Sequence, residues 1–125
     1  MPHFATTPFK IRKDMTMAKI INDSEFESII LNEKKPAVVD FYADWCGPCK
    51  MMAPLIDAME KKYAGKCGFY KVNVDEQVPL AVNYNIASIP TLMFFANGEL
   101  VSKSIGYITE EQLEKELDKI WKAIG

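Results

Sequence analysis

An apolar stretch from Ala37 to Tyr42 is the feature that most constrains the fold of this chain. Because the stretch is apolar without alternating, it predicts a strand that is buried on both faces of a sheet. A second strand is predicted over 69–74, and a helix with an apolar stripe is predicted over about 49–64, between the two strands. A crossover of this length joins parallel strands and winds right-handedly. We therefore expect a strand-helix-strand unit.

The second half of the chain predicts an antiparallel addition to this unit. A third apolar strand over 91–96 is followed by Asn97-Gly98, the strongest short signal for a tight hairpin, and by a return strand over about 100–104. A short helix is expected over about 79–85. The predicted fold class is α/β, with a mixed central β-sheet flanked by helices on both faces.

Capping residues indicate where the first and last helices begin. Ser24 and Glu27 match a capping box, in which each residue accepts a hydrogen bond from the backbone amide of the other. Thr109 and Gln112 match a second one. We therefore predict one helix that starts near Ser24 and another that starts at Thr109.

The length of 125 residues is enough for one domain and too short for two ordinary ones. Residues 1–17 show no clear period, and we expect them to form a flexible N-terminal extension. Residues 18–125 are expected to form the folded domain. No signal peptide is visible, because no apolar block follows Arg12 and Lys13.

The composition indicates which classes of partner and which kind of compartment are expected for this chain. A formal net charge of -2 argues against nucleic acid or an anionic membrane as the main partner, since both favour basic clusters. No apolar run approaches the ~20 residues that a membrane span needs. The three cysteines are fewer than a secreted disulfide scaffold would carry, which favours a reducing compartment. We expect a cytoplasmic monomer that binds neither nucleic acid nor a membrane.

Cys46 and Cys49 form a Cys-x-x-Cys pair between the first predicted strand and the helix that follows. Disulfide exchange needs a thiolate, and the unpaired amides of a first helical turn can stabilise one on Cys46. Pro48 suits that turn because it has no amide hydrogen, and Gly47 leaves room for another chain. Trp45 adds a flat apolar surface. The Cys46 thiolate is expected to attack a client disulfide, and Cys49 to resolve the mixed disulfide.

Asp40 is the only charged residue in the first predicted strand. Burying an isolated carboxylate is costly, so the pKa of Asp40 is expected to be raised. A carboxylic acid beneath the thiol pair could relay a proton to or from Cys49. Lys71, on the next parallel strand, is expected to offset part of the charge. The alternative for Asp40 is an edge position with access to solvent.

Two prolines stand where they can shape this site. Pro54 should bend the helix that carries the cysteines, because it removes one backbone hydrogen bond. That bend either aims the first turn or has no role. Pro90 precedes the third strand, and the Ile89-Pro90 bond is either trans or cis. A cis bond would leave a backbone edge free to pair with a client peptide near Cys46.

The combination of these motifs resembles the thioredoxin family. The resemblance covers about 19–125 and rests on several motifs in a fixed order. These are the segment from Val39 to Lys50 with its Trp-Cys-Gly-Pro-Cys core, Ala53-Pro54, the segment from Lys71 to Asp75, Ile89-Pro90-Thr91, Asn97-Gly98 and Gly106. Several ordered motifs are far more specific than one Cys-x-x-Cys pair.

The resemblance implies a thioredoxin fold and a protein-disulfide reductase. It assigns Cys46 as the nucleophile and Cys49 as the resolving thiol. It makes Asp40 the buried proton relay, with Lys71 as its neighbour, and it gives Pro90 the cis isomer. The implied client groove is lined by Trp45, Gly47, Pro48, Ser88, Ile89, Pro90, Ile105 and Gly106, with Tyr107 as a further candidate.

The resemblance also implies the partners. No bound cofactor is expected, because the Cys46–Cys49 disulfide itself carries the electrons. These would come from NADPH through thioredoxin reductase, a flavoprotein. The clients would be disulfide-containing proteins such as ribonucleotide reductase, peroxiredoxins and methionine sulfoxide reductases.

Other functions compete with this one. A structural zinc site needs four ligands, usually in two pairs, and Cys67 and His3 would have to complete it, so no metal is expected. An iron-sulfur cluster held by four cysteines is excluded within one chain, because only three exist. A disulfide oxidant or isomerase shares the fold but usually carries a different dipeptide between its cysteines. A binding module could clamp a partner without redox turnover, with Trp45 and Ile89 as anchors.

The chain departs from the family in three places. The extension before Met17 has no counterpart in a minimal thioredoxin. Cys67 is additional, and we expect a small buried or half-exposed thiol, with regulatory modification as the minor alternative. Tyr107 is bulkier than the small residue expected beside Gly106.

Overall fold

The structure is a computed structural model that describes residues 17–125. The predicted extension over residues 1–17 lies outside the described residues, apart from Met17. Strands and helices alternate as predicted. Their bounds are β1 (Lys19–Ile20), α2 (Asp23–Phe26), the π-helix η1 (Glu27–Asn32), β2 (Ala37–Tyr42), α3 (Gly47–Lys62), β3 (Gly68–Asn73), α4 (Val78–Asn83), β4 (Thr91–Ala96), β5 (Glu99–Ile105) and α5 (Glu110–Ile124).

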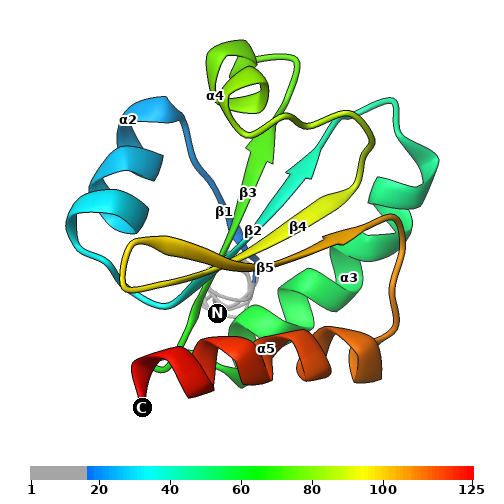
Figure 1. Ribbon diagram of the computed structural model, residues 1–125. Helices are drawn as coiled ribbons and strands as arrows, with labels where there is room; N and C mark the ends of the chain where they lie inside the picture. The colour runs from blue at the N-terminus through cyan, green and yellow to red at the C-terminus, as the bar shows by residue number, and fades with distance from the viewer. Residues whose placement is uncertain (1–16) are drawn as a thin grey trace, which may run out of the picture.

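The five strands form one mixed sheet in the order β1-β3-β2-β4-β5. β2 lies at its centre, parallel to β3 and antiparallel to β4, which confirms both the parallel unit and the antiparallel addition. β1 adds a parallel pairing to β3, and β5 adds an antiparallel pairing to β4. Figure 1 shows α3 and α5 on one side of this sheet and α2 and α4 on the other.

Each face of the sheet has its own apolar core. All six residues of β2 are buried, as a central strand covered on both faces requires. Side chains alternate along a strand, so β2 contributes Val38 to one core and Val39 to the other. The core under α3 and α5 includes Met52, Ile56, Met59, Leu113, Leu117 and Ile120. The core under α2, η1 and α4 includes Phe26, Ile30 and Leu80.

The first helix begins earlier than predicted, and its capping box uses different residues. The Asn22 side chain accepts the amide of Glu25 at 2.8 Å, and the Glu25 carboxylate accepts the amide of Asn22 at 3.0 Å. The predicted pairing of Ser24 with Glu27 was wrong because Asn is as favourable an N-cap as Ser, and Asn22 has the required acid three residues later. Beyond Phe26 the helix widens into η1, which no pattern in the sequence indicated.

The bounds of β2 and β4 are as predicted, and the other boundaries differ by one or two residues. β3 is displaced by one residue from the predicted 69–74, and α4 ends at Asn83, before the predicted 85. β1 was not predicted, because two residues are too short to show a period.

The hairpin and the last helix are confirmed. Asn97 and Gly98 both have positive φ, 57° and 83°, as the predicted tight turn between β4 and β5 requires. Thr109 is the N-cap of α5, and its hydroxyl accepts the amide of Gln112 at 3.2 Å. None of the helices described in residues 17–125 is sufficiently long and apolar to span a membrane.

Candidate active site

The start of α3 places both cysteines of the Cys-x-x-Cys pair at the carboxyl end of the central strand. Cys46 has an extended backbone and caps the helix, and its sulfur accepts the amide of Cys49 at 3.2 Å. The helix therefore begins at Gly47, two residues before the predicted start. Pro48 occupies the first turn, where a missing amide hydrogen costs nothing. The carbonyl of Cys46 accepts the amide of Lys50 at 3.2 Å.

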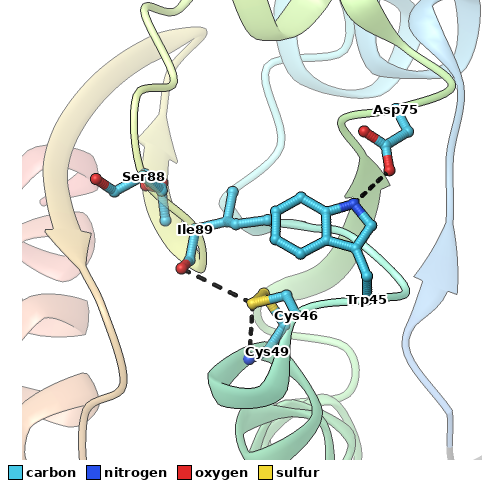
Figure 2. Close-up of a disulfide and its surroundings, with 7 residues drawn as sticks. Trp45, Cys46, Cys49, Asp75, Ser88 and Ile89 are labelled. Carbon is cyan, nitrogen blue, oxygen red and sulfur yellow. Dashed lines mark hydrogen bonds between the residues drawn. A yellow bond between two sulfur atoms is a disulfide. The ribbon is translucent and has the colours of Figure 1, made fainter.

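Cys46 and Cys49 are joined by a disulfide, with 5.2 Å between their Cα atoms. Both residues are buried, in a small cluster with Tyr42 and Ala43 at the end of β2. The Cys46 sulfur also lies 3.8 Å from the carbonyl oxygen of Ile89 (Figure 2). The start of α3 therefore holds the two cysteines close enough to form a disulfide with each other.

Trp45 forms an exposed apolar surface beside the disulfide. The residue is 70% exposed, and its indole N–H donates a hydrogen bond to the Asp75 carboxylate at 2.8 Å. Figure 2 shows the indole N–H directed at the Asp75 carboxylate. Asp75, which directs the Trp45 ring, was given no separate role in the sequence analysis. Its position after β3, at the edge that also carries Cys46, is the signal that could have found it.

The other predicted groove residues lie on two further segments beside the disulfide. The Ile89-Pro90 peptide bond is cis, as the resemblance implied. The carbonyl of Pro90 accepts the amide of Gly106 at 2.7 Å, which brings the end of β5 to the start of β4. Pro90 itself is buried, whereas Ser88 and Ile105 are exposed, the latter by 60%. Tyr107 is also exposed, by 50%.

Asp40 is fully buried, and neither carboxylate oxygen has a hydrogen-bond partner. It shares a face of β2 with Val38 and Tyr42, so it lies under α3, one pleat deeper than the disulfide cluster. Burial disfavours the charged form and raises the pKa of Asp40 to about 7, against an ordinary value of 3.8. The positive charge of Lys71 lowers this pKa, and the negative charge of Asp57 raises it.

Lys71 lies beside Asp40 in the register of β2 and β3, as predicted. Its ammonium group sits 4.5 Å from the centre of the Tyr42 ring, a cation–π contact. Among the residues that the structure describes, no ion pair joins Lys71 to Asp40. Lys71 therefore acts on the Asp40 carboxyl through its field, without a direct salt bridge.

Pro54 and Cys67 lie away from the disulfide. Pro54 is inside α3, which continues through it from Gly47 to Lys62. Cys67 is buried, as predicted, and burial raises the pKa of its thiol to about 12. Such a thiol is almost wholly protonated at neutral pH and is a poor nucleophile.

Within 17–125, no three His, Cys, Asp or Glu side chains gather closely enough to hold a metal ion.

Comparisons with known proteins match this geometry. A family model described as Thioredoxin matches residues 17–119. A protein named "Thioredoxin M-type, chloroplastic" from Pisum sativum is 42% identical, over 86% of this chain and 63% of its own length. "Thioredoxin, mitochondrial" from Mus musculus is 37% identical, over 96% of this chain and 72% of its own length. A solved structure of Plasmodium falciparum thioredoxin superposes with a TM-score of 0.74, at 38% identity, over 82% of this chain and 98% of that one.

The lengths of these relatives and the locations in their names bear on the function and the compartment expected from the sequence. The chain spans 63%, 55% and 56% of the length of three chloroplastic relatives. Their names, and that of the mouse protein, place those relatives in chloroplasts or mitochondria, which contradicts the expected cytoplasmic location. A low cysteine count indicates a reducing compartment, and it does not distinguish one such compartment from another.

Proposed function

Because the chain belongs to the thioredoxin family, we propose that it is a thiol-disulfide oxidoreductase that reduces disulfides in client proteins. The observation that carries this proposal is the Cys46–Cys49 disulfide at the N-terminus of a 16-residue helix. The order of strands and the match to a solved relative confirm the predicted fold. The domain boundaries, 1–17 and 18–125, stay a prediction.

The reaction begins from the reduced form, in which Cys46 is the attacking thiolate. The amide of Cys49 points at the Cys46 sulfur, and the free amides of the first turn of α3 favour a negative charge there. The thiolate attacks one sulfur of a client disulfide, a mixed disulfide forms, and the other client sulfur leaves as a thiolate that takes up a proton.

Cys49 completes the exchange. Its thiol loses a proton and attacks the Cys46 sulfur, which re-forms the Cys46–Cys49 bond and releases the second client thiolate. Two electrons pass from the dithiol to the client. The raised pKa of Asp40, about 7, suits it to take the Cys49 proton near neutral pH. Its place one pleat below the cysteines supports this role, with Lys71 setting the local field.

The client would bind over the exposed apolar surface around the disulfide. Trp45 and Ile105 provide that surface, and Gly47 leaves the approach to Cys46 open, because nothing lies within 4 Å of where a side chain on it would begin. The backbone at Ile89 and Pro90 would pair with the client chain. Pro48, Ser88 and Gly106 complete the proposed groove.

Partners and electron source follow from the family. We propose that a thioredoxin reductase, itself supplied by NADPH, returns the disulfide to the dithiol, and that the chain acts as a monomer without a bound cofactor. The test is an insulin-reduction assay with NADPH, run with and without a thioredoxin reductase. Turnover that depends on the reductase is the expected result. If the protein failed to reduce insulin even after its own Cys46–Cys49 disulfide had been reduced chemically, that result would contradict the proposal.

Replacing the resolving cysteine should trap the client. In the Cys49→Ser variant, Cys46 still attacks, but the mixed disulfide has no neighbouring thiol to release it. We expect a covalent complex whose mass, measured by mass spectrometry, is the sum of the masses of this protein and its client. Dithiothreitol should separate the two by reducing the mixed disulfide. The matched control is Cys67→Ser, which should release its client as the unchanged protein does. A Cys49→Ser protein that forms no adduct would reverse the assigned order of the two cysteines.

A further inference from the structure

The loop between β5 and α5 forms one side of the proposed client groove. We call residues 106–108 the groove loop; it follows Ile105, the last residue of β5, and its middle residue is the exposed Tyr107. Gly106 has a φ of 90°, so the chain turns sharply where it leaves the sheet. Figure 1 shows the segment from β5 to α5 passing beside α3, the helix that carries the cysteines. A client chain lying over the disulfide would therefore meet this loop.

Hydrogen bonds to three different elements hold the groove loop in place. At its start, the amide of Gly106 donates to the carbonyl of Pro90, next to β4, at 2.7 Å. Just after its end, Thr109 caps α5. At its last residue, the backbone amide of Ile108 donates to the thioether sulfur of Met52 at 3.4 Å. This third bond ties the loop to α3.

The bond to the sulfur lies inside the protein. Met52 is fully buried and Ile108 is 9% exposed, and both belong to the core under α3 and α5. A buried backbone N–H needs an acceptor, and within 17–125 the Met52 sulfur is the one acceptor that the structure gives this amide. A thioether is a weak acceptor, but a side chain of pure hydrocarbon at this position would leave the amide unpaired.

We propose that Met52 is a positioning residue for client binding: its sulfur holds the amide of Ile108 and thereby fixes the groove loop against the helix that carries the cysteines. Met52 comes three residues after Cys49, about one turn further along α3. One helix thus sets the place of the reacting sulfurs and of the loop that a client touches. This inference rests on the proposed function and deepens it, because it concerns how the same site receives its substrate.

The loss of this bond should affect large and small disulfides differently. Met52 packs in the core under α3 and α5, whereas Cys46 and Cys49 belong to the separate cluster at the end of β2. Attack by the Cys46 thiolate should therefore not depend on the Met52 sulfur. A protein client needs the groove loop in its place, whereas a small disulfide can reach Cys46 without touching the loop.

The first test is the rate of hydrogen exchange at the Ile108 amide, followed by NMR in the oxidised protein. Met52→Leu removes the acceptor and nearly conserves the volume of the side chain. The matched control is Met59→Leu, the same substitution about two turns further along α3, in the same core. We expect exchange at Ile108 to be faster in Met52→Leu than in Met59→Leu, by about fivefold or more.

The second test compares two substrates in a single turnover of the chemically reduced protein. Insulin is the protein client, and hydroxyethyl disulfide is the small one. We expect Met52→Leu to lower the second-order rate constant for insulin by about fivefold relative to Met59→Leu, the size that corresponds to one hydrogen bond. The rate constant for hydroxyethyl disulfide should be the same in the two variants. A general loss of structure would lower both.

Equal exchange at Ile108 in Met52→Leu and Met59→Leu would overturn the proposal. An unchanged rate with insulin would also overturn it, and so would an equal loss with both substrates. Met52→Ile provides the same comparisons if the Leu variant does not fold. The exchange measurement needs no catalysis, so it judges whether Met52 holds the loop even if the wild-type protein fails to reduce insulin. That failure would count against the proposed function alone.

Discussion

Substituting serine for Cys46 should abolish the reduction of insulin disulfides. The hydroxyl of serine does not ionise near neutral pH, so no nucleophile remains at the helix N-terminus. We expect the rate to fall by at least about 100-fold, to the rate of insulin with dithiothreitol alone. The change should have little effect on folding, because serine is nearly isosteric and can cap a helix. Circular dichroism and thermal unfolding of the reduced proteins check this second expectation.

The control for this result is Cys67→Ser, which removes a cysteine that is buried and protonated. It should retain the full rate of insulin reduction. Turnover by Cys46→Ser within a few-fold of the wild-type rate would mean that another group performs the attack. If the double variant Cys46→Ser, Cys49→Ser kept its biological activity, the chain would act as a binding module instead.

Neutralising Asp40 should stabilise the protein, by an amount that depends on pH. The pKa of Asp40 is raised by burial from 3.8 to about 7 in the folded state. Well below about pH 4, both the folded and the unfolded states hold the proton, and ionisation of the carboxyl adds nothing to the free energy of unfolding. Between the two pKa values only the folded state holds it, so stability falls as pH rises. Above about pH 7 the penalty is constant, at roughly 4 kcal/mol.

The Asp40→Asn variant removes this penalty because its amide does not ionise. Its free energy of unfolding should exceed that of the wild type increasingly from about pH 4 to pH 8, by up to roughly 4 kcal/mol. Urea unfolding of the oxidised proteins across this range is the measurement. Asp118→Asn, an equal change of net charge on the exposed side of α5, should show no such dependence. A constant difference between Asp40→Asn and wild type at every pH would show that the pKa of Asp40 is the same in the folded and unfolded states, which would contradict the prediction. The same variant should reduce insulin more slowly, since the proton acceptor for Cys49 is gone.

The strand-helix-strand unit, the hairpin and the position of the cysteines could be predicted from the sequence because each depended on a strong local signal. A continuous apolar run marks β2, a Cys-x-x-Cys pair with a proline marks the start of α3, and Asn97-Gly98 marks the hairpin. The cis bond at Pro90 was different. The residues alone left both isomers open, and only the resemblance to a family favoured one of them.

The features that were missed depend on contacts between distant segments. The bond from Ala18 to Asp57 joins residues 39 positions apart, and that from Trp45 to Asp75 joins residues 30 apart. No period or short motif encodes such a pair. The Asn22 cap was missed for the opposite reason, because two overlapping capping signals compete within six residues and sequence spacing does not rank them.

The two apolar layers, one on each side of the central sheet, have a consequence for how this protein can change. The cysteine-bearing helix packs into only one of them, and the layer around Phe26 and Leu80 lies behind the strands. Substitutions accumulating in that rear layer would alter resistance to heat while sparing the reacting sulfurs. Lineages living at different temperatures could thus adjust durability and redox chemistry on separate surfaces of a single sheet.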